Sequence, residues 1–188
     1  MLPRQPSVVR RAVKRVPTCW LMTDRRLGSA MPRIAARLPP RSAIVIRPYA
    51  MAQEGRAALI RRLRHVARAK RHLLLLAGGG SLHGYDGRHL GGSYQQSGQR
   101  PAFLSTPVHD RREATAALRQ GADAALISPV HATRSHADGQ PLGLRGFARL
   151  SAQFRGRAVA LGGMTAPKFR RLRCHGASGW AAIDAWLD

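Results

Sequence analysis

The sequence is short of acidic residues, of aromatic residues and of long apolar runs. Of its 188 residues, 9 are Asp or Glu and 32 are Lys or Arg, and only 5% are aromatic. The longest apolar run, residues 73–77, has the length of a strand, which excludes a membrane-spanning helix. The two cysteines, Cys19 and Cys174, lie far apart and fit no paired metal spacing. Neither a disulfide scaffold nor a zinc finger is therefore expected.

The net charge of +23 makes nucleic acid the first partner to consider. Each phosphate that a basic side chain neutralises releases a counterion and raises affinity. The charge is diffuse, however, and nearly all of it is arginine, a usage that genome composition alone can produce. Few aromatic side chains are available to stack on bases, and no helix-turn-helix, RNP or finger signature is visible. We therefore do not expect nucleic acid to be the main partner.

Residues 1–17 form a basic opening stretch that we expect to be a solvated extension. This stretch carries five basic residues and no acidic one, so a nucleic-acid arm and an Arg-rich transit peptide are alternatives. Residues 18–188 then form one domain, whose 44% apolar content is typical of a globular chain. We expect a cytoplasmic protein, and leave a homodimer open.

Eight short apolar runs follow the extension. Most of them do not alternate between apolar and polar residues, a pattern typical of strands that are buried on both faces. The runs are residues 19–22, 43–46, 72–77, 88–90, 102–104, 124–127, 158–161 and 179–183.

Four of the intervening segments have helical periodicity or helix end signals. They are residues 53–71, 110–120, 144–154 and 166–173. The second of them has Asp110 as a candidate N-cap, Glu113 three residues later and Gly121 as a stop signal. A strand followed by a helix, repeated along the chain, predicts parallel strands with right-handed crossovers.

This rhythm predicts a closed (β/α)₈ barrel. The alternative, an open doubly wound sheet, needs a glycine-rich phosphate turn after the first strand, which residues 22–26 do not supply. A length of 188 residues is below the roughly 200–250 typical of such barrels. Residues 78–87 and 91–100 are too poor in apolar residues for normal helices. We therefore predict a compact barrel whose third and fourth crossover helices are reduced to loops.

The carboxyl ends of the strands are where such barrels carry their chemistry. Gly162 and Gly163 directly follow the seventh run. Paired glycines at this place allow backbone N–H groups to approach an anion. A tight turn with Thr165 as the N-cap explains the same residues equally well. Arg47 directly follows the second run and can point into the mouth of the barrel.

The loop after the sixth run is a second candidate anion site. Thr133, Arg134 and Ser135 supply two hydroxyl groups and a guanidinium group suited to phosphate oxygens, with His131 and His136 on either side. An exposed polar loop with local turns is the alternative interpretation.

The remaining histidines and acidic residues predict no metal site. The six-residue spacing of His83 and His89 matches no ligand pattern, so we expect scattered loop residues. His65 and His72 are expected at the surface near the end of a helix. Nine acidic residues leave little material for a Mg²⁺ site.

From about residue 18 to the end, and most specifically over residues 121–165, the sequence resembles thiamine phosphate synthase and the related TenI proteins. The similarity is carried by residues 121–130, 133–135, 141–144 and 161–165, and more weakly by residues 20–25 and 86–91. The resemblance implies a (β/α)₈ barrel. The implied reaction joins hydroxymethylpyrimidine diphosphate to a thiazole phosphate with loss of pyrophosphate, assisted by Mg²⁺.

The resemblance also assigns roles to residues at matching positions. Thr133 and Ser135 match the loop that holds the thiazole phosphate, and Gly163 falls in the family's Gly-Gly-Ile turn. Ser105 matches a serine that contacts the pyrimidine substrate. Arg47 stands where the family has an arginine in its Gln-Leu-Arg-Glu-Lys motif.

The sequence departs from the family mainly in the metal and diphosphate half of the site. The glutamine and lysine beside Arg47 are absent, and the metal-binding residues are replaced in segments 77–79 and 92–94. A lysine of the family has become His136, and Asp184 stands near a serine that helps to bind phosphate. No cofactor is therefore certain, and Mg²⁺ requires ligands other than those of the family.

Three functions remain open at this point. The leading hypothesis is a transferase of the thiamine phosphate synthase type, with Arg47 in its site. The second is a metal-independent protein that binds or tautomerises a thiazole phosphate, with His131 or His136 as the acid/base because imidazole titrates near neutral pH. The third is a non-catalytic barrel that binds an anion or nucleic acid.

Overall fold

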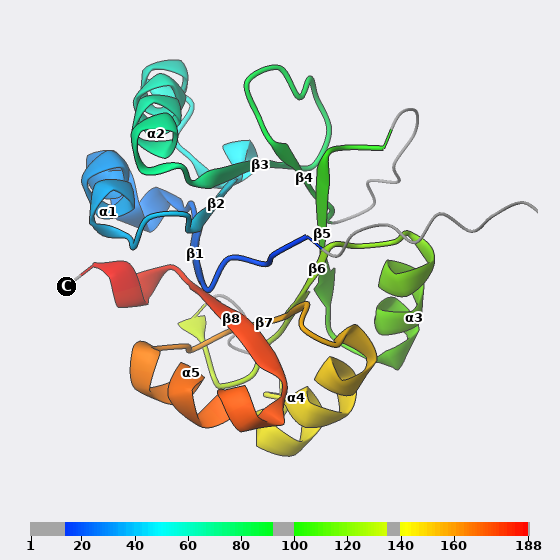
Figure 1. The fold of residues 1–188 in the computed structure, drawn as a ribbon. Helices are drawn as coiled ribbons and strands as arrows, with labels where there is room; N and C mark the ends of the chain where they lie inside the picture. Colours follow the sequence, from blue (N-terminus) through cyan, green and yellow to red (C-terminus); the bar gives the residue numbers. More distant parts are fainter. Residues whose placement is uncertain (1–13, 92–99, 135–139, 188) are drawn as a thin grey trace, which may run out of the picture.

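Eight parallel strands close into a barrel in the computed structural model, which describes residues 14–91, 100–134 and 140–187 (Figure 1). Neighbours in sequence pair throughout, and β1 pairs with β8, so the sheet has no free edge. The strands are β1 (Cys19–Met22), β2 (Ala43–Ile46), β3 (Leu73–Ala77), β4 (Gly87–His89), β5 (Phe103–Val108), β6 (Ala124–Ile127), β7 (Ala158–Leu161) and β8 (Ala177–Ala182). Each overlaps one of the eight predicted runs, and the predicted (β/α)₈ barrel is confirmed.

The strands are apolar on both faces because both faces are buried. Alternate side chains point inward and fill the barrel, among them Trp20, Leu75 and Leu126, which are fully buried. The intervening residues, such as Ile44 and Ile127, point outward and pack under helices. This arrangement is the physical reason why the runs do not alternate between apolar and polar residues.

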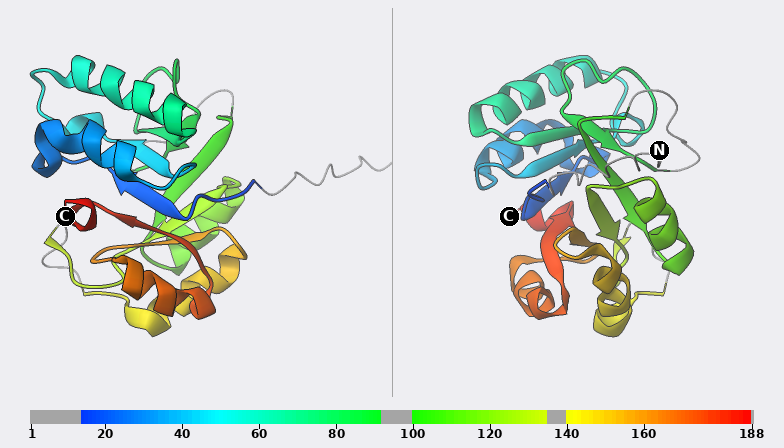
Figure 2. Two further views of the ribbon diagram at one scale, coloured as in Figure 1. Left: turned by 60° about the vertical axis from the view of Figure 1, so that its left-hand side comes forward. Right: turned by 45° about the vertical axis from the view of Figure 1, so that its right-hand side comes forward.

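In the described ranges, five α-helices cover the barrel from outside. They are α1 (Met31–Arg37), α2 (Arg56–Lys70), α3 (Arg111–Arg119), α4 (Gly143–Ser151) and α5 (Ala166–Leu172). Helices α1 and α2 lie together on one flank, and α4 and α5 lie on another (Figure 2). Each flank has its own apolar cluster beneath the helices.

The connection between β3 and β4 is a loop, as predicted for the third crossover. Arg88 of β4 is buried and donates hydrogen bonds to the carbonyl oxygens of Gly78 and Gly80 in this loop, the latter at 2.7 Å. The guanidinium group thus holds the loop at the place that a helix would otherwise cover. Most of the fourth connection, residues 92–99, lies outside the described residues.

Helix α1 was not predicted, and its packing corrects one expectation. The helix has seven residues, too few to show a clear period, and is fixed by the buried side chains of Met31 and Ile34. His72, expected at the surface, is only 5% exposed. Its Nε2 lies 3.0 Å from the Ala35 carbonyl oxygen of α1, and its Nδ1 accepts a hydrogen bond from the Ser42 backbone N–H. This imidazole therefore joins α1 to β2 and β3.

Helix α3 begins at the predicted N-cap. The Asp110 carboxylate accepts a hydrogen bond of 2.7 Å from the Glu113 backbone N–H. The Glu113 carboxylate in turn accepts one from the backbone N–H of His109, one residue before the cap. Two N–H groups at the helix start are thus satisfied by side chains.

Residues 14–17, the described part of the opening stretch, lie against one end of the barrel (Figure 1). Val16 is buried with the residues that fill the barrel. Lys14 lies 3.8 Å from Asp123 and above the Phe103 ring. Residues 1–13 lie outside the described part of the chain.

Candidate functional site

A pocket of about 230 Å³ opens at the carboxyl ends of β1, β2, β6, β7 and β8. Its lining comes from segments that are far apart in sequence and that barrel closure brings together. The lining residues are Met22, Arg26, Arg47, Ser128, Pro129, Ala132–Arg134, Leu161–Met164 and Ala181–Ala185. The pocket thus lies at the end of the barrel where the sequence predicts the chemistry.

The end of β7 and the glycine turn after it, Gly162 and Gly163, are hydrogen-bonded to the loop that follows β6. The backbone N–H groups of Val130 and His131 donate to the carbonyl oxygens of Leu161 and Gly162, at 2.9 and 3.1 Å. A Cβ atom on Gly162 would lie 2.8 Å from Pro129 Cα. One on Gly163 would lie 2.5 Å from the Ala132 carbonyl oxygen. Both glycines also have positive φ, so close packing and backbone conformation each require glycine here.

Five of the predicted site residues line this one pocket. They are Arg47, Thr133, Arg134, Gly162 and Gly163. Ser105 and His131 are not among the lining residues, and Ser135 and His136 lie outside the described residues. Thr165 occupies the N-cap position of α5 but makes no capping hydrogen bond through its side chain.

Arg47 is fixed by the turn that follows β1. Its backbone N–H donates to Thr23 Oγ1 and its Nε donates to the Thr23 carbonyl oxygen, both at 2.8 Å. Its Nη2 donates to Asp24 Oδ2 at 3.0 Å. Because two hydrogen bonds of its own set its direction, the guanidinium group is pre-organised at the wall of the pocket.

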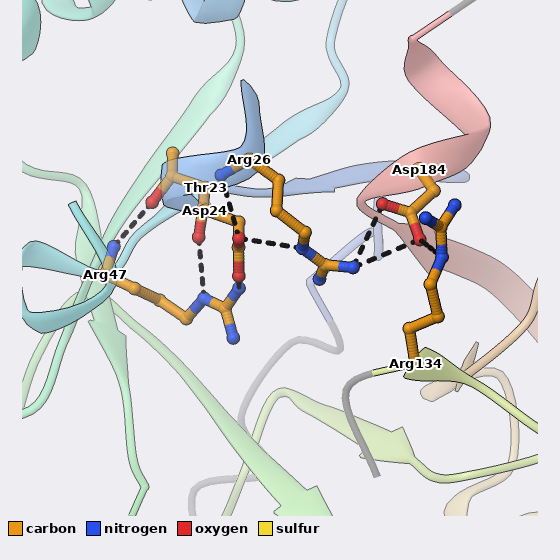
Figure 3. Close-up of polar contacts among 6 residues, drawn as sticks. All are labelled: Thr23, Asp24, Arg26, Arg47, Arg134 and Asp184. Carbon is orange, nitrogen blue, oxygen red and sulfur yellow. Dashed lines mark hydrogen bonds and ion pairs between the residues drawn. The ribbon is translucent and has the colours of Figure 1, made fainter. Parts of the chain in front are cut away.

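Arg26 and Asp184 extend this arrangement across the pocket (Figure 3). Arg26 Nε donates to Asp24 Oδ1 at 2.9 Å, and Arg26 Nη1 lies 3.1 Å from Asp184 Oδ1. Arg134 Nε lies 3.5 Å from Asp184 Oδ2. Three guanidinium groups and two carboxylates therefore alternate along one wall.

Asp24 is ionised in this setting. Burial alone would raise its pKa, but the hydrogen bonds and charge of Arg26, with the charge of Arg47, outweigh that effect and lower the pKa below its usual value. Asp24 and Arg26 were not predicted as site residues. Their only signal was their position just after a strand end.

A second polar group lies inside the barrel. His89 of β4 is fully buried, and its Nδ1 lies 2.9 Å from Oγ of Ser105 on β5. Burial, with the nearby charge of Arg47, lowers the pKa of His89 to about 4, so the imidazole is neutral at neutral pH. His89 is thus a buried strand residue, not the loop residue that we expected, and it is a further site candidate that sequence reasoning missed. Ser105 belongs to this group.

His131 lies beside the pocket on the loop after β6. Burial, with the charge of Lys168, lowers its pKa. Its Nε2 is buried and has no hydrogen-bond partner within the described part of the chain. Lys168 Nζ donates to the Gly163 carbonyl oxygen at 2.7 Å, so the lysine also holds the glycine turn.

The described residues do not fit a divalent cation. Across residues 14–91, 100–134 and 140–187, no three His, Cys, Asp or Glu side chains form a group that could hold a metal ion. Asp24 and Asp184, the two carboxylates that alternate with the three arginines, each lie between two guanidinium groups. Mg²⁺ is usually held by one or two carboxylates together with waters and substrate phosphates, and each of these two carboxylates is already paired with guanidinium groups.

No helix in the described part of the chain has both the length and the apolar character needed to cross a membrane.

Comparisons of the sequence with known proteins agree on one family. A family model described as thiamine monophosphate synthase matches residues 22–186. The thiamine-phosphate synthase of Methanoregula boonei is 32% identical over 109 residues, which cover 54% of this chain and 50% of that protein. A provisionally assigned second thiamine-phosphate synthase of Aquifex aeolicus is 35% identical over 81 residues, which cover 43% of this chain and 44% of that protein. The aligned region thus spans about half the length of these curated relatives.

Solved structures show the same fold. The thiamine phosphate pyrophosphorylase of Pyrococcus furiosus superposes with a TM-score of 0.71 at 23% identity, covering 89% of this chain and 86% of that one. The enzyme of that name from Bacteroides thetaiotaomicron gives 0.59 at 12% identity, with coverages of 90% and 84%. At these identities the likeness establishes the barrel and no more.

Proposed function

The chain belongs to the thiamine monophosphate synthase family, and from this premise we propose that it acts in thiamine biosynthesis as a transferase of the thiamine phosphate synthase type. The substrates are hydroxymethylpyrimidine diphosphate and a thiazole phosphate. The observation that carries the proposal is that Arg47, Thr133, Arg134 and the glycine turn line a single pocket.

The thiazole phosphate occupies the side of the pocket formed by the loops after β6 and β7. Thr133 offers a hydroxyl group, Arg134 a guanidinium group, and the turn at Gly162 and Gly163 a backbone without side chains. Charge-assisted hydrogen bonds of this kind are the strong ones for phosphate oxygens. Ser135 belongs to the same segment and completes the group in this proposal.

The pyrimidine diphosphate lies deeper, toward Arg47 and the His89–Ser105 pair. In the reaction, the thiazole ring nitrogen forms a bond to the methylene carbon of the pyrimidine. The bond from that carbon to the diphosphate oxygen breaks, and the electron pair leaves with pyrophosphate. Negative charge grows on the leaving group, and Arg47 and Arg26 are placed to stabilise it.

The neutral state of the His89 imidazole supports the proposed position of the pyrimidine. A protonated imidazole beside Arg47 would repel it, whereas a neutral ring that is hydrogen-bonded to Ser105 can accept or donate one further bond. Such a pair suits the polar edge of a pyrimidine. His89 and Ser105 are therefore proposed as substrate-positioning residues.

The direct test is formation of thiamine phosphate from the two purified substrates, with and without Mg²⁺. We expect product with the wild type, and a loss of about 10²-fold in rate for Ser135→Ala or Thr133→Val, since each removes a hydrogen-bond donor to the phosphate. Thr115→Val on α3 is the matched control, because its exposed hydroxyl bonds only within its own helix. Absence of product at high enzyme concentration rejects the synthase.

A second candidate function is favoured by the absence of a carboxylate cluster from the described residues. A metal-independent protein that binds or tautomerises a thiazole phosphate would need one acid/base and no cation. His131, which is neutral because its pKa is lowered, and His136 are the candidates for this role. Proton exchange from a thiazole precursor that survives both His131→Ala and His136→Ala rejects the assignment of these histidines as the acid/base.

A further inference from the structure

Asp184 lies in the wall of the pocket with its carboxylate turned toward two arginines (Figure 3). It is at the start of the short helix η6 (Asp184–Trp186), after β8. Arg26, from the turn after β1, lies 3.1 Å from one oxygen, and Arg134, from the loop after β6, lies 3.5 Å from the other. Two guanidinium groups from separate parts of the barrel thus converge on one small anion.

This contact is one that an incoming anion can replace. The side chains of Arg26 and Asp184 are 30% and 33% exposed, and that of Arg134 is 79% exposed. Ion pairs that are accessible to water contribute little, typically about 0–1 kcal/mol. A phosphate carries more charge and more acceptor oxygens than a carboxylate, so it competes well for the same guanidinium groups.

Arg26 does not depend on Asp184 for its direction. Its Nε and its backbone N–H both bond to Asp24 Oδ1, at 2.9 and 3.1 Å. Asp24 is itself held by Arg47 from the other side, at 3.0 Å. If the Asp184 carboxylate moves away, Arg26 therefore still points into the pocket.

The net charge of these five side chains favours an anion without a bound cation. Three guanidinium groups and two carboxylates carry a net charge of +1 (3 − 2), and release of Asp184 leaves three positive groups facing one carboxylate. This excess of positive charge attracts an anion to the place that the Asp184 carboxylate leaves.

We propose that Asp184 is an internal counter-ion that a phosphate or diphosphate group displaces from Arg26 and Arg134, so that this site takes its anion without a divalent metal ion. Arg26 is then an anion-binding residue, and Asp184 sets the affinity of the site. The proposal rests on the proposed function for the phosphate character of the ligand, but it concerns binding and not turnover.

Calorimetric titration of the full chain with inorganic pyrophosphate, in EDTA and separately in Mg²⁺, tests the proposal. We expect Asp184→Asn to bind about 10-fold more tightly, since it keeps the shape and removes the competing charge, and Arg26→Gln and Arg134→Gln to bind about 10-fold more weakly. Arg112→Gln on the exposed face of α3 removes the same charge elsewhere and should change the affinity less than about twofold.

Two results overturn the proposal. One is an Asp184→Asn variant that binds as weakly as the wild type or more weakly, because the carboxylate then supports the site. The other is pyrophosphate binding that occurs only with Mg²⁺. Arg134 is largely exposed, so Arg134→Gln should fold and still tests the proposal if Arg26→Gln does not fold. If pyrophosphate binds but no thiamine phosphate forms, the synthase function is rejected and this proposal stands. If the protein is an active synthase but Asp184→Asn binds pyrophosphate with unchanged affinity, this proposal is rejected and the synthase function stands.

Discussion

At the scale of single residues, the chain buries two histidines, His72 and His89. His89 is enclosed by the barrel, and His72 is enclosed between α1 and the strands. Burial lowers the pKa of both, so each is neutral in the folded protein. The unfolded chain takes up protons at these positions near pH 6.5, whereas the folded chain does not.

The stability of the protein should consequently fall as the pH is lowered. The unfolded state binds more protons than the folded state between about pH 6.5 and the lowered pKa of His89, about 4, so the free energy of unfolding decreases with falling pH. The contribution of His89 is on the order of 3 kcal/mol over this window. Urea unfolding at pH 7, 6, 5 and 4.5 measures it.

The matched variants for this measurement are His89→Gln and His65→Gln. The first removes the buried titrating group, and we expect its stability to depend less steeply on pH than that of the wild type. The second changes an exposed histidine of α2 and should leave the slope unchanged. An equally steep decline in His89→Gln would show that other groups cause the pH dependence.

At the scale of elements, the unusual feature is the side of the barrel without a helix between β3 and β4. Arg88 of β4 binds the carbonyl oxygens of Gly78 and Gly80. Asp86 accepts a hydrogen bond of 2.7 Å from the Leu74 backbone N–H, which fixes the other end of the loop. Polar side chains thus hold this loop in addition to the apolar packing of Leu82 and Tyr85.

Arg88→Met should therefore destabilise the fold although it makes the side chain more apolar. The substitution leaves two carbonyl groups without their donor, and we expect a loss of about 2 kcal/mol in the free energy of unfolding. Chemical denaturation measures the loss. Arg119→Met, at the exposed end of α3, is the control and should cost less than about 0.5 kcal/mol. Equal effects of the two substitutions would contradict this role of Arg88.

At the scale of the whole molecule, the scarcity of acidic residues gains a structural meaning. Six of the nine acidic side chains are engaged in contacts that hold the described fold together, namely Asp24, Asp86, Asp110, Glu113, Asp123 and Asp184. Glu54 is exposed, and Asp138 and Asp188 lie outside the described residues. Little acidic material is therefore left to neutralise the 32 basic side chains or to hold a cation.

A net charge of +23 should make the stability depend on salt. Like charges repel one another in the compact state, and added salt screens them with a Debye length of about 10 Å at 0.1 M. We expect the Tm to rise by about 2–4 °C between 20 and 300 mM NaCl, corresponding to roughly 1 kcal/mol. Chloride is chosen because sulfate and phosphate are the anions that the proposed site would bind. A Tm that stays constant or falls over this range would show that self-repulsion does not limit stability.

Local sequence determined most of the elements. Four strands, β1, β2, β6 and β7, have the predicted bounds because a short apolar run between turn residues has few other solutions. The cap at Asp110 and the stop at Gly121 are interactions within a few residues of one another. Helix α1 escaped prediction because its seven residues are held by tertiary contacts rather than by a period of their own.

The sequence by itself thus determined the barrel and the segments that carry the pocket, since short apolar runs, helix ends and the glycine turn are local properties. Only the tertiary structure decided which charges meet there. Arg26 and Asp184 are 158 positions apart, and His89 and Ser105 lie on different strands, so no pattern along the chain pairs them. Closure of β1 against β8 and of β4 against β5 sets those distances, and electrostatic interaction depends on distance in space rather than along the chain.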